Sequence, residues 1–206
     1  PQPTFFVGRN KEIEDIVGLI NNPHCRLLTL SGPGGIGKTR LAIETARQRF
    51  STLSDGSAFI SPQNLTSKEA ILTALAESLQ IRLSPDRGSC EQVLECLAEK
   101  YLLLVLDSFE YVPESIILLT DILQHAPHVK ILTTSRELLN LMEEWVYEIG
   151  GLSIPASDFE NDIEHYGAVQ LFMHNARRIH HSFVLTLENK PAVSRICRLV
   201  GGMPLG

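Results

Sequence analysis

Apolar runs of strand length alternate with segments of helical period along the first 150 residues. Several of these runs are almost continuously apolar, which is typical of strands whose two faces are both covered by helices. The alternation indicates stacked βα units, so we expect an α/β fold with a parallel five-stranded sheet. The predicted strands are Leu27–Leu30, Ser57–Ile60, Leu102–Leu106 and Lys130–Thr133, with an edge strand at Trp145–Ile149.

Apolar residues recur at helical spacing between these strands. The first predicted helix, over residues 10–20, carries its isoleucines and a valine on one stripe. Capping-box pairs, Thr66 with Glu69 and Ser89 with Gln92, predict where two later helices begin. The other predicted helices are Thr39–Phe50, Ser67–Leu79, Ser89–Lys100, Glu114–His125, a short stretch after Arg136, Glu164–Ile179 and Pro191–Val200.

The composition changes at Gly150 and Gly151. Residues after this point have helical patterns but no convincing strand core, and Leu152–Asp158 has the small residues and proline of a linker. We therefore predict an α/β domain over residues 1–150 and a small helical subdomain over residues 151–206, which is short for an independent core.

Composition and charge exclude several classes of protein. Hydrophobic residues make up 44% and charged residues 20%, which excludes disordered and collagen-like chains. The apolar runs are too short for a membrane helix and no signal-peptide pattern is visible, so we expect no membrane contact and a cytoplasmic location. The net charge of −6 argues against direct nucleic-acid contact. Cys25, Cys90, Cys96 and Cys197 form no CxxC pair, which favours free buried thiols.

A glycine-rich segment, Gly32–Thr39, fits the phosphate-loop pattern GxxxxGK[ST] directly after a predicted strand and directly before a predicted helix. Glycines let backbone N–H groups converge on a phosphate, and the helix N-terminus adds positive partial charge. Lys38 is expected to reach the β- and γ-phosphates. An ordinary βα turn with a solvated lysine is the alternative. The residues expected to contact nucleotide here are Gly32, Gly34, Gly35, Ile36, Gly37, Lys38, Thr39 and Arg40.

Asp107 ends the apolar strand that begins at residue 102, and ligands of open α/β sheets bind at such strand ends. We expect Thr39 and Asp107 to hold Mg²⁺, although a helix-capping aspartate is the alternative. Many P-loop hydrolases place a second acid at the next position, which is Ser108 here. Glu110 is the candidate to polarise water, or else a solvated loop residue, so hydrolysis is expected to be slow.

Arg136 follows another strand that ends in polar residues. Its guanidinium could pair with the γ-phosphate, or Ser135 could cap a helix and leave Arg136 in solvent. The apolar residues before Gly8 and Arg9 could wrap an adenine or form a packed arm. Near the end, Gly201–Pro204 is by itself only a helix stop.

Six motifs in this order resemble the STAND class of signal-transduction ATPases, which includes the NB-ARC domains of apoptotic and plant immune receptors. The similarity is nearest to bacterial members fused to transcription-factor or repeat domains. The motifs are FFVGR (5–9), SGPGGIGKTRLA (31–42), LLLVLDSFE (102–110), ILTTSRE (131–137), AVQLFMHNARRI (168–179) and GGMPLG (201–206).

The resemblance implies an ASCE-type P-loop NTPase that binds ATP, ADP and Mg²⁺. It implies that Val7 and Arg9 contact the nucleotide, that Pro204 packs on its adenine or ribose side, and that Arg136 senses the γ-phosphate. It also implies partners: effector and sensor domains of a larger protein, a winged-helix domain after residue 206, and self-association in the ATP state.

The main hypothesis is an ATP/ADP-dependent regulatory switch with slow Mg²⁺-dependent hydrolysis. One alternative is a structural module that holds ADP permanently without turnover. Another is a P-loop kinase acting on a small metabolite, with Arg177 and Arg178 in a lid, although those residues fit a solvated face better. The sequence has no guanine-reading Asn/Thr-Lys-x-Asp motif, which favours adenine.

Overall fold

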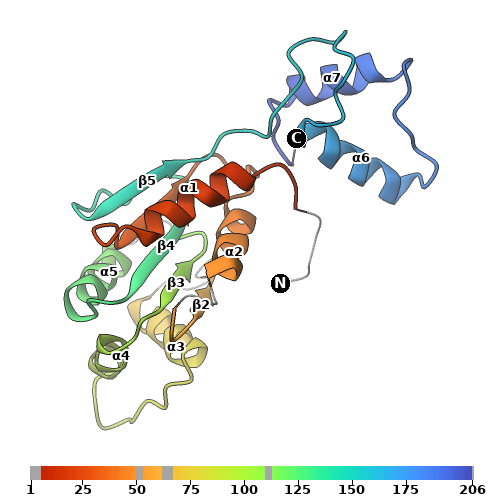
Figure 1. Cartoon of the computed structure of the whole chain (residues 1–206). Helices are drawn as coiled ribbons and strands as arrows, with labels where there is room; N and C mark the ends of the chain where they lie inside the picture. Colours follow the sequence, from red (N-terminus) through yellow and green to blue (C-terminus); the bar gives the residue numbers. More distant parts are fainter. Residues whose placement is uncertain (1–5, 50–52, 62–66, 110–112, 206) are drawn as a thin grey trace. The chain divides into compact units, whose positions relative to one another are not determined.

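The computed structural model describes residues 6–49, 53–61, 67–109 and 113–205 (Figure 1). The chain divides into two compact units. The first, called here the sheet unit, comprises Ile13–Gly32 and Lys38–Glu148. The second, called the helical unit, comprises Pro1–Glu12, Pro33–Gly37 and Ile149–Gly206.

The sheet unit contains five parallel strands in the order β2-β3-β4-β1-β5. This arrangement confirms the predicted α/β fold and places the last strand at an edge, as expected. Each strand lies within two residues of its predicted bounds, and β4 continues two residues further than predicted. The strands are β1 Leu27–Ser31, β2 Ser57–Ile60, β3 Leu103–Leu106, β4 Lys130–Ser135 and β5 Glu144–Glu148.

Helices cover both faces of this sheet. On β3, Leu104 and Leu106 belong to the apolar cluster formed with α3 (Lys68–Ser78), α4 (Ser89–Ala98) and α5 (Pro113–His125). Leu103 and Val105 point to the opposite face and are equally buried. The remaining helices that contribute to this unit are α1 (Asn10–Asn21), which begins in the helical unit, and α2 (Lys38–Arg49), which contacts β1, β3 and β4.

The helix predicted after Arg136 is absent from the described residues, and this prediction was wrong. Residues 136–143 form bends and a turn instead. The Glu144 carboxylate accepts hydrogen bonds from the backbone N–H groups of Leu139 at 3.1 Å and Asn140 at 2.8 Å. Asn140 also has a φ of +58°, which a right-handed helix does not allow. The side chain of Glu144 therefore satisfies two backbone N–H groups of this non-helical segment.

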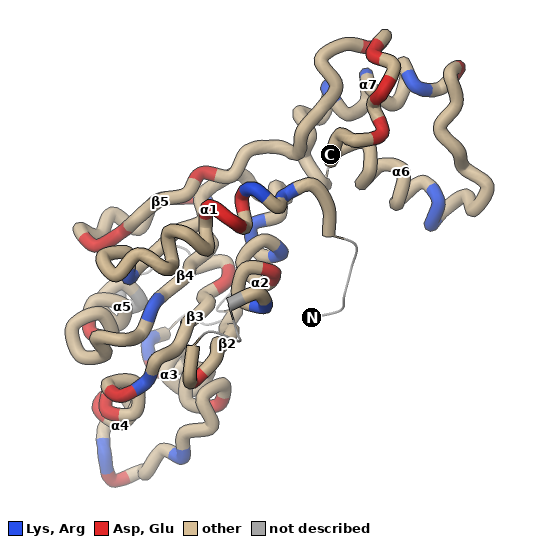
Figure 2. Tube along the Cα trace, in the orientation of Figure 1, with Lys and Arg blue, Asp and Glu red and all other residues tan. Residues whose placement is uncertain are grey.

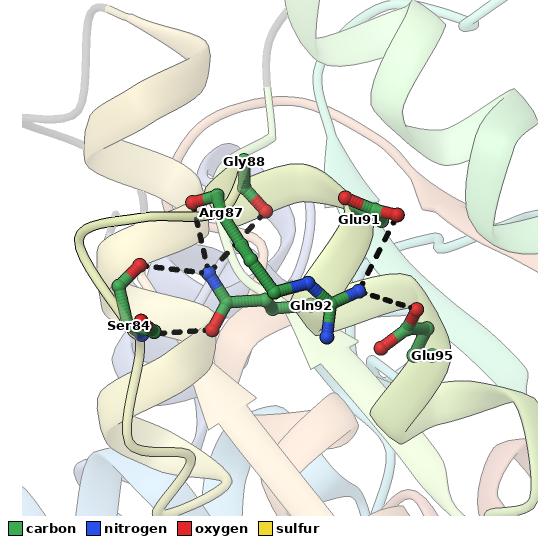
Figure 3. A network of polar contacts seen from close by, with 6 residues as sticks. All are labelled: Ser84, Arg87, Gly88, Glu91, Gln92 and Glu95. Carbon is green, nitrogen blue, oxygen red and sulfur yellow. Dashed lines mark hydrogen bonds and ion pairs between the residues drawn. The ribbon is translucent and has the colours of Figure 1, made fainter.

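The predicted cap of α4 was also wrong. The capping position is Gly88, which has no side chain to cap the helix, and the Gln92 side chain makes its hydrogen bonds to backbone groups of Ser84, Arg87 and Gly88 (Figure 3). Its Oε1 accepts from Ser84 N at 2.8 Å, while Nε2 donates to the carbonyls of Ser84 and Arg87 at 3.0 Å and of Gly88 at 3.5 Å. At α3, Ser67 is the cap and accepts from the Ala70 N–H, whereas Thr66 lies outside the described residues.

The helical unit contains α6 (Gly167–Ile179) and α7 (Lys190–Leu199) around a small apolar cluster. The segment predicted as a linker has no helix or strand but packs into this unit, because Leu152 is buried and its N–H donates to the Gly202 carbonyl at 2.9 Å. The α6 helix begins three residues later than predicted, where Ser153 Oγ accepts from the Gly167 N–H at 2.9 Å.

Two further observations concern the described residues as a whole. None of their helices is both long enough and apolar enough to cross a bilayer. All four cysteines are free; Cys25 and Cys197 are buried as expected, whereas Cys90 and Cys96 are only partly buried.

Candidate functional site

The phosphate-loop sequence connects β1 to α2 directly, since β1 ends at Ser31 and α2 begins at Lys38. Gly35 and Gly37 have φ values of +79° and +100°, a backbone region that side-chain-bearing residues rarely adopt. Within the loop the Ile36 N–H donates to the Pro33 carbonyl at 3.4 Å. The glycines at these positions therefore allow the tight strand-to-helix turn that the motif requires.

Thr39 and Asp107 meet within the sheet unit. Thr39 lies in the first turn of α2, and Asp107 is the first residue after β3, where it is 4% exposed. The Thr39 hydroxyl donates to Asp107 Oδ1 at 2.6 Å. Two residues that lie 68 positions apart and were predicted to share one cation are thus in direct contact.

A third residue, Thr134, joins this pair and was missed by the sequence analysis. It lies near the end of β4, the strand between β1 and β3, and its hydroxyl lies 2.7 Å from Asp107 Oδ1. The polar ending of this strand was visible in the sequence. That β4 lies beside β3 was not, and this adjacency is what makes Thr134 a partner of Asp107.

The Lys38 ammonium donates to the Gly32 carbonyl at 2.6 Å. Arg40 follows in the first turn of α2 and is half-buried. Arg136 is exposed and directly follows β4, two residues after Thr134. Ser135 Oγ accepts from the Glu137 N–H at 3.2 Å, but it caps no helix, because residues 136–143 form bends and a turn. Glu110 lies outside the described residues.

Arg9, in the helical unit, has a buried guanidinium with three acceptors in that unit. It donates to the Ile36 carbonyl at 2.9 Å, to the Gly150 carbonyl at 3.0 Å and to Glu12 Oε1 at 3.1 Å. The side chain is 3% exposed, so these bonds form away from bulk water. In this structure, Arg9 therefore supports the phosphate loop through its backbone.

The remaining predicted contacts also lie in the helical unit. A Cβ built on Gly37 would lie 3.9 Å from the Pro204 ring, and one on Gly35 would lie 3.1 Å from Leu205 Cβ. Pro204 is therefore close to the loop. Val7 is half-buried, and Gly34 is exposed at the tip of the loop.

The oxygen atoms around Asp107 are suited to Mg²⁺, which prefers hard oxygen ligands. The Thr39 hydroxyl donates a hydrogen bond to Oδ1, so the lone pairs of its oxygen are available to a cation. Oδ2 of Asp107 accepts no hydrogen bond from the described residues. This donor set fits a magnesium site.

Comparisons with known proteins place this geometry in context. No family model matches the chain. An uncharacterized protein of Mycobacterium tuberculosis is 30% identical over 203 residues, covering 98% of this chain and 49% of that protein. Another protein of that species, whose name assigns it provisionally to the HTH-type transcriptional regulators, is 32% identical over 181 residues, covering 87% of this chain and 19% of that protein. The chain thus spans about half of one curated relative and about a fifth of the other.

Three solved structures share the fold. Cdc6p from Pyrobaculum aerophilum matches 85% of this chain and 51% of its own, with a TM-score of 0.62 and 19% identity. A STAND protein with a tetratricopeptide repeat sensor from Pyrococcus horikoshii matches 100% and 29%, with a TM-score of 0.58 and 17% identity. The ORC2 protein of Aeropyrum pernix, solved as ADPNP–ADP complexes, matches 86% and 54%, with a TM-score of 0.57 and 13% identity. These matches confirm the predicted P-loop ATPase fold.

Proposed function

We propose that this chain binds ATP and ADP with Mg²⁺ at its phosphate loop and serves as the nucleotide-dependent switch of a larger signalling protein. The observation that carries the proposal is the 2.6 Å hydrogen bond from Thr39 to Asp107, directly after the glycine-rich turn. The shared fold with a STAND protein and with an ORC2 protein solved with nucleotides supports it.

The predicted phosphate, metal and base contacts have separate roles in this proposal. The backbone N–H groups of the loop bind the β-phosphate, and Lys38 exchanges the Gly32 carbonyl for phosphate oxygens. Thr39 and Asp107 would hold Mg²⁺, which neutralises charge on the β- and γ-phosphate oxygens. We assign Arg136 to the γ-phosphate. We also assign Val7, Arg9 and Pro204 to the base and sugar side.

Turnover is expected to be slow because the position after Asp107 carries no carboxylate. Ser108 has a φ of +55°, and its N–H donates to the Thr134 hydroxyl at 2.7 Å. No carboxylate at this position therefore polarises an attacking water, which leaves Glu110 as the candidate for that role. Slow hydrolysis suits a switch, since the ATP-bound state then lasts long enough for other domains to respond to it.

The proposed partners are effector and sensor domains of the same polypeptide, together with other copies in the ATP state. One relative carries the name of an HTH-type transcriptional regulator and one structural neighbour is a protein with a repeat sensor, which supports domains of these kinds as the partners. Direct nucleic-acid contact by this chain is not part of the proposal. In the described part, Figure 2 shows acidic and basic residues interleaved along the trace, and the net charge of the chain is −6, which does not favour a nucleic-acid surface.

The first test is the identity of the nucleotide that heat denaturation releases from freshly purified protein, measured by chromatography. Titration calorimetry with ATP and ADP then gives the affinities, and phosphate release gives the turnover. We expect Lys38→Ala to weaken binding at least about 10-fold, since it removes a charge-assisted phosphate contact. Lys11→Ala, an exposed lysine on α1, is the matched control and should bind normally.

The alternatives predict different results. Stoichiometric ADP with no phosphate release would replace the switch with a permanently ADP-bound structural module. Phosphate transfer to a small metabolite would indicate a kinase. Protein that binds neither ATP nor ADP would refute the proposal.

A further inference from the structure

One residue, Thr134, contacts three consecutive residues after β3. Its hydroxyl lies 2.7 Å from Asp107 Oδ1 and 2.7 Å from the Ser108 backbone nitrogen. Its carbonyl accepts from the Phe109 N–H at 2.9 Å. Thr134 is 1% exposed, so water does not compete for these bonds. The turn that carries the metal-site carboxylate is thus held by one residue of the neighbouring strand.

The direction of these bonds follows from the chemistry of the groups. A backbone N–H only donates, so the Thr134 hydroxyl must accept from Ser108. A hydroxyl has one proton, and a carboxylate only accepts, so that proton goes to Asp107 Oδ1. Thr39 donates to the same oxygen. Both hydroxyl protons therefore point to Oδ1, and Oδ2 accepts no hydrogen bond from the described residues.

We propose that Thr134 is the positioning residue for the magnesium site: it orients the Asp107 carboxylate and thereby sets how much Mg²⁺ strengthens nucleotide binding. This inference rests on the proposed nucleotide-binding function and adds a residue to it. Partners that orient metal ligands commonly change metal affinity 10- to 100-fold when they are lost. Arg136, which we assign to the γ-phosphate, follows Thr134 by two residues. The end of β4 therefore carries both the γ-phosphate contact and the residue that orients the Asp107 carboxylate.

The neighbouring residue, Thr133, shows that this is not a general property of β4 threonines. Thr133 is 0% exposed and pairs in register with Thr29 on β1, and its hydroxyl donates to the Thr29 hydroxyl at 3.1 Å. Its side chain points to the face of the sheet opposite to that of Thr134, since successive side chains on a strand alternate between faces. Thr133 therefore offers a matched control with the same residue type, strand and burial.

The test compares Thr134→Val, Thr134→Ser and Thr133→Val with the unmodified chain. Titration calorimetry measures the affinity for the non-hydrolysable analogue AMPPNP, once with excess Mg²⁺ and once in EDTA. The ratio of the two affinities is the Mg²⁺ enhancement. We expect Thr134→Val to reduce this enhancement about 10- to 100-fold while the affinity in EDTA stays within about 2-fold. Thr134→Ser keeps the hydroxyl and should stay near the unmodified value, as should Thr133→Val.

Three outcomes would overturn the proposal. The enhancement could be unchanged in Thr134→Val, the affinity could fall equally with and without Mg²⁺, or Thr133→Val could lose the same enhancement. Each would mean that Thr134 is only structural. If Thr134→Val does not fold by circular dichroism, Thr134→Ala replaces it. An unmodified chain that binds AMPPNP in neither condition would refute the proposed function itself, and this inference with it.

Discussion

The sheet unit and the helical unit differ in the kind of internal packing that stabilises each of them. The sheet unit buries a large continuous apolar cluster between its strands and the helices α3, α4 and α5. The helical unit has only a small cluster, drawn from α6, α7 and the segments around Leu152 and Ile163. A core of that size contributes little hydrophobic free energy.

The helical unit instead depends on close backbone packing at glycines. A Cβ on Gly151 would lie 2.0 Å from the Gly201 carbonyl oxygen, and one on Gly202 would lie 2.2 Å from the Leu152 carbonyl oxygen. Gly202 also has a φ of +68°. The comparison teaches that the stability of the sheet unit depends on the volume of buried apolar side chains. The packing of the helical unit depends on glycines, whose lack of a side chain lets backbone segments approach closely.

The largest effect is expected in the sheet core. Leu104 lies on β3, is 0% exposed and belongs to the main apolar cluster. Leu104→Ala should lower the free energy of unfolding by about 2–5 kcal/mol, because it removes buried methyl groups and leaves a cavity. Chemical denaturation followed by tryptophan fluorescence measures this, since Trp145 on β5 reports on the same sheet. A loss under about 1 kcal/mol would contradict the role assigned to apolar volume.

A smaller effect is expected from a single added methyl group in the helical unit. Gly151→Ala should destabilise that unit by about 1–3 kcal/mol, because the new Cβ collides with a backbone carbonyl that has little room to move. Hydrogen exchange in α6 and α7 would measure the loss. Gly150→Ala is the control, since nothing lies within 4 Å of its Cβ position. Equal effects of the two substitutions would contradict the proposed packing role of Gly151.

The smallest effect concerns charge at the surface of the helical unit. The Tyr166 hydroxyl donates to Glu160 at 2.6 Å, and together with the Ala156 N–H at 2.9 Å it lowers the pKa of Glu160. The same bond raises the pKa of Tyr166. The hydrogen bond between Tyr166 and Glu160 therefore stabilises the folded state at neutral pH. This stabilisation is lost as the pH falls through the folded-state pKa of Glu160 or rises through that of Tyr166.

The hydrogen bond from the Tyr166 hydroxyl is the largest cause of the lowered pKa of Glu160. Tyr166→Phe removes this bond, so the pKa of Glu160 should rise toward its ordinary value. Titration by carbon-detected nuclear magnetic resonance of the carboxyl groups measures this directly. Glu164 is the internal control, because its pKa is lowered mainly by a hydrogen bond from Lys190 and should not move. An unchanged Glu160 titration would show that the tyrosine is not the cause.

Much of the fold was predictable because apolar runs directly reflect burial. Leu102–Leu106 differs by one residue from the observed β3, since a strand covered on both faces leaves an uninterrupted apolar run. The failures have a common cause. Glu144 and Gln92 bind backbone groups of nearby loops, and neither the hydrophobic pattern after Arg136 nor the capping-box spacing at Ser89 shows these partners.

The sequence by itself determined the glycine-rich turn, the lysine and threonine after it, and the aspartate at the end of a buried strand, because each depends on residues adjacent in the chain. The tertiary structure alone decided which of them meet. Strand order places β4 between β1 and β3, so Thr134 reaches Asp107 while Thr133 faces Thr29. Parallel strand order depends on packing across the whole sheet, and no local pattern specifies it.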